Sequence, residues 1–174
     1  MFAASKTSTP VAAGPTSDPY FNYVTALLHG DGTNGGQNNT FVDSSTNNFS
    51  ITRNGDTTQG TINPFNGGNY SVYFDGTGDY LSFSSSAGLT ASTGDFTLEF
   101  WFFNTHTTWS KGMDFTDASA GGSAVYVAAD ATFRIAPQGS ASTSFGSITA
   151  PNAPLGSWNH FAVVRSSGTS KAYV

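Results

Sequence analysis

Four side chains near the middle of the sequence have the types that bind carbohydrate: Trp101, Phe103, His106 and Trp109. Aromatic rings stack on the apolar faces of pyranose sugars, and polar groups beside them fix the hydroxyls. These four residues are the predicted glycan-binding set. The alternative is that Trp101 and Phe103 pack beneath an outer sheet or against a neighbouring subunit, because aromatics in sandwich proteins usually belong to a packed core.

Aspartates in predicted loops have the oxygen ligands that a calcium ion takes, about six to eight at a time. Asp75 and Asp79, which flank a Gly-Thr-Gly run, are the predicted calcium pair. The alternative is turn formation, because Asp before Gly is first of all a turn former. None of the loop aspartates has the spacing of a recognised calcium loop, and calcium is the one cofactor left open. The other loop aspartates are Asp31, Asp43, Asp114 and Asp117.

The histidines and cysteines offer no further metal chemistry. His29, His106 and His160 lack the spacing of zinc ligands, and the chain has no cysteine. His160 lies inside the predicted strand that begins at Trp158, where a structural histidine with satisfied ring nitrogens is expected.

The run from Phe96 to Phe103 has to position the aromatic set. Its even-numbered positions are all apolar, whereas the other side begins with Thr97 and Glu99 and ends with Trp101 and Phe103. A period of two predicts a strand with its apolar side buried. The second side is typical of a strand whose far end reaches a binding surface or a second packed layer. We therefore expect this run to be the central strand of a β-sandwich.

Short apolar runs of the same kind recur between turn clusters, and no segment has the three-four spacing of a long helix. Asn54–Asp56 and Asp75–Asp79 contain residues that tolerate positive φ, and both are predicted hairpin turns. The other predicted strands are Val24–His29, Phe49–Arg53, Tyr70–Phe74, Tyr80–Phe83, Val125–Ala128, Thr132–Ala136 and Trp158–Arg165. The predicted fold class is therefore all-β, an antiparallel sandwich.

Residues 1–19 form a separate unit in this interpretation. They are rich in small polar residues, with Pro10, Pro15 and Pro19 at intervals, and they have little apolar surface to bury. We expect an extended N-terminal arm over 1–19 and a single sandwich domain over 20–174.

Composition excludes several classes of partner. The net charge is −5 with only six Lys and Arg residues, which are scattered, so nucleic acid is not expected as a partner. No run of about 18 apolar residues predicts membrane insertion, and the N-terminus lacks the apolar core of a secretory signal peptide.

Five motifs in order resemble the laminin-G-like, concanavalin A-like jelly-roll domains, and most closely the copies in structural proteins of tailed bacteriophages, marine cyanobacterial phages especially. The resemblance spans residues 18–174. The motifs are Leu27–Thr33, Phe41–Phe49, Tyr73–Leu81, Gly94–Phe102 and Trp158–Arg165.

This resemblance implies a non-catalytic structural protein on the virion surface, made in the host cytoplasm, as a tail fibre or head-decorating fibre. The arm and open sheet edges would then bind other virion proteins, the chain would form a homo-oligomer, and cell-surface polysaccharide would be the ligand. The alternative is a free-standing or enzyme-attached extracellular carbohydrate-binding module.

Two departures from the family pattern affect these expectations. Further strands usually follow the Ala-Tyr-Val segment, so the sandwich is expected to lack its last strands. Glucanases of this fold use two carboxylates, typically alternating glutamates on one strand. Glu99 is the one glutamate of this chain, and its neighbours on the same side are Thr97 and Trp101. The sequence therefore predicts no glycosidase of that type.

Overall fold

The computed structural model describes residues 18–30, 40–60, 62–65, 70–84, 94–105, 110–114, 122–127, 132–138, 148–152 and 154–174. Pro10 and Pro15 of the predicted arm lie outside these residues, and Pro19 lies in the turn that precedes a short 3-10 helix. No helix in the described residues is long and apolar enough to cross a membrane. The elements are η2 Phe21–Tyr23, β1 Ile51–Asn54, β2 Thr58–Gly60, β3 Ser71–Tyr73, β4 Tyr80–Phe83, β5 Phe96–Phe103, β6 Ser110–Asp114, β7 Gly122–Val127, β8 Thr132–Gln138, β9 Ile148–Asn152, β10 Trp158–Ser166 and β11 Thr169–Tyr173.

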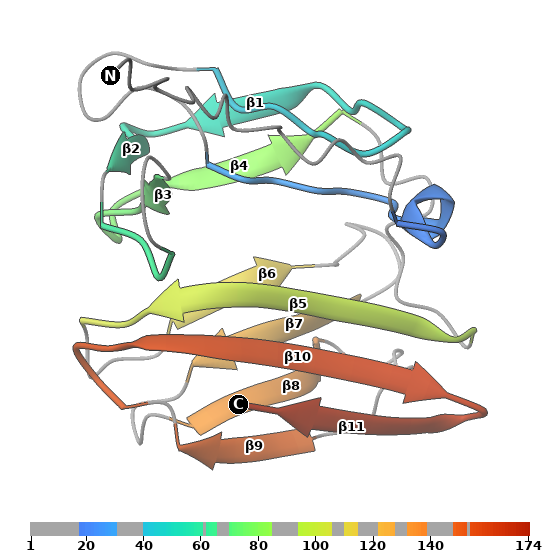
Figure 1. Cartoon of the computed structure of the whole chain (residues 1–174). Coiled ribbons are helices and arrows are strands. Elements are labelled where there is room, and N and C mark those ends of the chain that lie inside the picture. The colour runs from blue at the N-terminus through green and yellow to red at the C-terminus, as the bar shows by residue number, and fades with distance from the viewer. Residues whose placement is uncertain are drawn as a thin grey trace, which may run out of the picture.

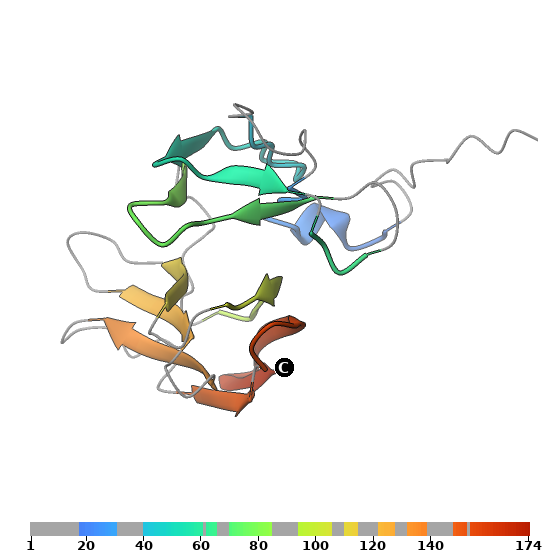
Figure 2. The same cartoon turned by 90° about the vertical axis from the view of Figure 1, so that its left-hand side faces the viewer.

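Two antiparallel sheets form the sandwich. One has the strand order β11-β10-β5 and the other has the order β6-β7-β8-β9. The three-stranded sheet lies in front of the four-stranded sheet in Figure 1, and Figure 2 shows the two sheets facing each other from the side. Strands β9 and β11 contact each other where the sheets meet. The prediction of an all-β, antiparallel sandwich is therefore confirmed.

The inner face of the three-stranded sheet holds the core. Phe161 and Val163 of β10 are fully buried, and the apolar side of β5 packs around them together with Met113 of β6 and Ala172 of β11. The burial of β5 alternates as its sequence predicts. One expectation was wrong: β10, which pairs with both β5 and β11, is the middle strand of this sheet, and β5 lies beside it.

Strands β1 to β4 form a separate two-stranded ribbon above β5 (Figure 1). Here β1 pairs with β4 and β2 pairs with β3. Asn54–Asp56 joins β1 to β2 and Asp75–Asp79 joins β3 to β4, so neither turn closes a hairpin. Each of the two predicted hairpin turns instead interrupts one side of the ribbon. The first separates β1 from β2, and the second separates β3 from β4 on the paired side. The ribbon reverses between β2 and β3, at a tip that includes residues 62–65.

Asp79 joins the two interruptions. Its Oδ1 accepts the Asp56 N–H at 2.8 Å, and its Oδ2 accepts the Asp75 N–H at 2.9 Å. Gly55 has a φ of +70°, which an L-residue adopts only with strain, and a Cβ there would collide with Asp79 Oδ1. Gly55 and Asp79 together therefore allow the bend.

Gly55→Ala is expected to lower the free energy of unfolding by about 2–3 kcal/mol, because backbone strain adds to displacement of Asp79. Urea denaturation followed by circular dichroism measures this change. Gly76→Ala is the matched control, because Gly76 also has a positive φ, of +90°, but a Cβ there would meet nothing within 4 Å. That variant should lose only about 1 kcal/mol. Equal losses in the two variants would contradict the role given to Asp79.

A buried carboxylate organises the segments that precede the ribbon. Asp43 is 2% exposed. Its Oδ1 accepts the N–H groups of Leu27 and Ser45 at 2.9 and 3.0 Å, and its Oδ2 accepts the Ser45 hydroxyl and the Phe49 N–H at 2.8 and 2.9 Å. Asp43 thus holds residues 27 and 43–49 together.

Candidate functional site

The outer face of the three-stranded sheet presents exposed aromatic and charged side chains. Trp101 of β5 lies opposite His160 of β10, with their ring centroids 5.1 Å apart and the ring planes inclined by 42°. Trp101 remains 44% exposed. Glu99 precedes Trp101 on the same face, and its Oε2 lies 3.5 Å from Nε2 of His160. We call Glu99, Trp101 and His160 the platform.

A second aromatic pair extends this face along the strands. Phe103 of β5 lies opposite Trp158 of β10, with ring centroids 5.5 Å apart and planes at 66°. Both side chains are only partly buried. Their rings pack against each other, and they continue the apolar surface beyond the platform.

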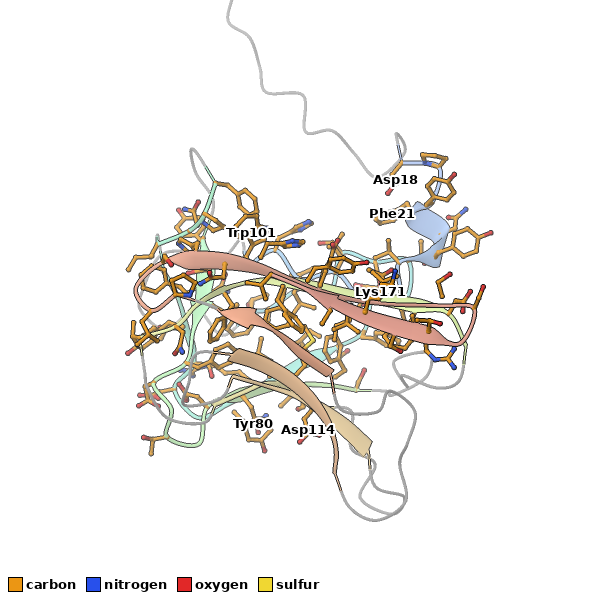
Figure 3. The ribbon with its side chains drawn as sticks, turned by 90° about the horizontal axis from the view of Figure 1, so that it is seen from below. Asp18, Phe21, Tyr80, Trp101, Asp114 and Lys171 are labelled. Carbon is orange, nitrogen blue, oxygen red and sulfur yellow. The ribbon has the colours of Figure 1, made fainter. Side chains whose placement is uncertain are left out.

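The tip of the ribbon reaches the platform. Residues 62–65 descend from β2 toward the C-terminal end of β5 (Figure 1). Phe65 lies edge-on to Trp101, with ring centroids 5.5 Å apart and planes at 75°. In Figure 3 the Trp101 side chain points away from the four-stranded sheet, on the same side as η2. Trp101 is therefore contacted on the outer face and does not belong to the sandwich core.

The structure brings together two of the four predicted glycan-binding residues. Trp101 and Phe103 share the outer face, while His106 and Trp109 lie outside the described residues. Sequence reasoning missed Trp158 and assigned His160 to a structural role, yet the His160 side chain is 41% exposed. The alternation of Trp158 and His160 along β10 was the available signal, because it places both on one face.

The predicted calcium pair is part of a small acidic cluster. Carboxylate oxygens of Asp56, Asp75 and Asp79 lie within 4.8 Å of one another. The same groups bind the turns, since Asp79 accepts two N–H groups and Oδ1 of Asp75 accepts the Thr77 N–H at 2.6 Å. Turn formation thus accounts for these contacts, and calcium binding stays a prediction. The other aspartates are elsewhere: Asp43 is buried, Asp114 ends β6, and Asp31 and Asp117 lie outside the described residues.

The hydrogen bonds to Asp79 favour its charged form. The N–H of Asp75 has the largest effect and lowers the pKa of the Asp79 carboxyl, with further help from Asp56 and Thr57, against a raising effect of burial. The carboxylate is therefore ionised at neutral pH, which suits an acceptor that fastens two turns.

The platform has no arrangement of paired acids. Thr97 and Trp101 flank Glu99 on the same face of β5, and Ala162 lies opposite it on β10. Glycoside hydrolysis by the usual route requires two carboxyl groups across the scissile bond. The Glu99 carboxylate can accept hydrogen bonds from sugar hydroxyls, and the adjacent rings of Trp101 and His160 offer a stacking surface.

Comparison with known proteins agrees with this architecture. Residues 75–174, more than half of the chain, match a laminin-G-type family model described as the concanavalin A-like lectin/glucanases superfamily. Searches of curated proteins and of solved structures gave no match. The matched residues include β4 to β11, and so the whole sandwich and the platform. The chain belongs to the concanavalin A-like lectin/glucanases superfamily.

Proposed function

We propose that this chain is a non-catalytic, lectin-like structural protein of a tailed-phage virion, and that its platform binds cell-surface polysaccharide. The observation that carries the binding proposal is the exposure of Trp101 beside His160 and Glu99. An exposed indole with a hydrogen-bond acceptor at its side is the chemistry that a sugar ring needs, because the ring has an apolar face and a rim of hydroxyls.

The virion setting comes from the five sequence motifs that resemble phage structural proteins. A surface appendage carries many copies of its subunits, and repeated weak contacts with polysaccharide then act together. Assembly through the N-terminal arm, a homo-oligomeric state and exposure on the virion surface are parts of the same proposal. Mass spectrometry of purified virions tests the setting: the chain should be present in stoichiometric amount. Its recovery only from the culture medium would support the alternative of an extracellular carbohydrate-binding module.

The proposed absence of catalysis rests on the carboxylates. Glu99 is the only glutamate in the sequence, and the flanking positions on its face carry no acid. Prolonged incubation of the purified chain with a polysaccharide that it binds should release no new reducing ends. Sustained release would contradict this part of the proposal.

Trp101→Ala is expected to weaken glycan binding at least about tenfold, because the variant removes the main stacking surface. An array of neutral glycans identifies a ligand, and isothermal titration calorimetry then measures its affinity for the wild type and the variant. Tyr80→Ala is the control, since Tyr80 is 55% exposed but lies on β4 of the ribbon, and this variant should bind as the wild type does. Unchanged binding by Trp101→Ala would exclude the platform as the glycan site.

A further inference from the structure

Phe65 stands at one end of the platform. The rings of Trp101 and His160 are inclined by only 42°, so they form one shallow surface, whereas the ring of Phe65 meets Trp101 at 75°. His160 lies on the β10 side of Trp101, and residues 62–65 come from the ribbon on the opposite side of β5 (Figure 1). Phe65 is therefore a steep wall at the end of the platform that lies away from β10.

The position of this wall is determined by local structure. Oδ1 of Asn63 accepts the Phe65 N–H at 2.9 Å, which is the Asx-turn that an Asn-Pro sequence favours. Pro64 restricts its own φ within the turn. The contact of the Phe65 ring with Trp101 places the tip against β5. Phe65 is still 52% exposed, so a ligand on Trp101 can also contact its ring.

We infer that Phe65 determines specificity, so that the platform takes the terminal portion of a neutral glycan; this inference rests on the proposed glycan-binding function. The last sugar would stack on Trp101 with its end against Phe65, and the chain would leave across His160. An internal segment, which continues in both directions, would collide with the Phe65 ring.

The charge of the platform indicates the class of sugar. Glu99 is the acid beside Trp101, and its side chain is 63% exposed. Lys171 shares the outer face but lies opposite Val164, further along the strands from Trp101 than Glu99. A uronic or sialic acid on Trp101 would be repelled by Glu99, whereas neutral hydroxyls can donate hydrogen bonds to it.

The test compares free chain ends with internal segments. Affinity is measured for ladders of neutral gluco-, galacto- and manno-oligosaccharides and for the matching long polymers, at equal concentrations of sugar residues. The wild type should prefer the oligosaccharides by at least about tenfold, because ends are rare in the polymers. Phe65→Ala should bring this ratio close to one, while Trp101→Ala should weaken binding to both.

Two further variants distinguish Phe65 from its loop. Ile62→Ala removes another exposed apolar side chain of the same segment, 66% exposed, and should keep the wild-type ratio. Asn63→Ala should shift the ratio as Phe65→Ala does, and Asn63→Asp, which retains an oxygen acceptor, should restore it. Binding that depends on Trp101 but shows the same ratio in wild type and Phe65→Ala would overturn this inference alone. No binding of any ladder by the wild type would overturn the proposed function and this inference with it.

Discussion

Replacing Phe161 by alanine is expected to lower the free energy of unfolding by about 3–5 kcal/mol. Phe161 is fully buried in the middle strand, and its ring packs on Phe100 with centroids 5.3 Å apart. The loss combines the transfer of the ring to water in the unfolded state with the cavity that remains between the two sheets. Urea denaturation followed by circular dichroism measures the change.

The matched control is Tyr173→Ala on β11 of the same sheet. Tyr173 is 51% exposed on the outer face, so its removal should change stability by less than about 1 kcal/mol. If Phe161→Ala cost no more than this control, the inner face of the sheet would not be the core of the sandwich.

Asp43→Asn is expected to cost about 2–3 kcal/mol, although the side chain keeps its size. One carboxylate oxygen of Asp43 would become an NH₂ group, which cannot accept a hydrogen bond. That NH₂ group would face either the N–H groups of Leu27 and Ser45 or the N–H group of Phe49. Hydrogen exchange should accelerate at these amides before it changes in β10. Asp18→Asn is the control, because Asp18 is exposed and its Oδ1 accepts the Tyr20 N–H, a bond at the surface. That variant should be close to neutral.

The stability contributed by Asp43 should also depend on pH. Burial is the largest single influence and raises its pKa, but the hydrogen bonds from Leu27, Ser45 and Phe49 together outweigh burial and hold the pKa of Asp43 below its ordinary value. A carboxyl with a lowered pKa in the folded state contributes fully above the unfolded-state pKa and loses its contribution as the pH falls through the folded-state pKa. The difference between wild type and Asp43→Asn should therefore shrink below roughly pH 5. A difference that stays constant to the acid end would contradict an ionised Asp43.

Strand β5 could be predicted from sequence because its burial follows the period of two. The bounds of β4 and β5 agree with the predicted runs, and β10 extends the predicted run by a single residue. Alternation of this kind is a local property, since each residue's side of the sheet follows from its position in the strand.

The pairing of the ribbon could not be predicted from local patterns. Asn54–Asp56 and Asp75–Asp79 have the composition of hairpin turns, and only the register of β1 with β4 shows that they interrupt longer strands. Val24–His29 was expected to be a strand, but it forms only an isolated bridge between Leu28 and Asp43. The Leu27 N–H donates to the Asp43 side chain instead of to a neighbouring strand. Buried polar contacts of this kind leave no hydrophobic period in the sequence.

The candidate site was predictable in part for the same reason. Trp101 and Phe103 follow from the alternation of β5, which fixes their common face. The contact of Trp101 with Phe65 joins residues from the ribbon and the sandwich, and nothing in the Asn-Pro-Phe sequence indicates that the ribbon tip meets β5. The alternation along β10 places His160 on one face with Trp158, but its position opposite Trp101 follows only from the register of β10 with β5.

A crystal structure of the chain with the tightest-binding neutral oligosaccharide tests the central claim most directly. We expect a sugar ring stacked on Trp101, with hydroxyls within hydrogen-bond distance of Glu99 or His160. An oligosaccharide bound at the Asp56, Asp75 and Asp79 turns, with the Trp101 ring bare, would contradict the claim.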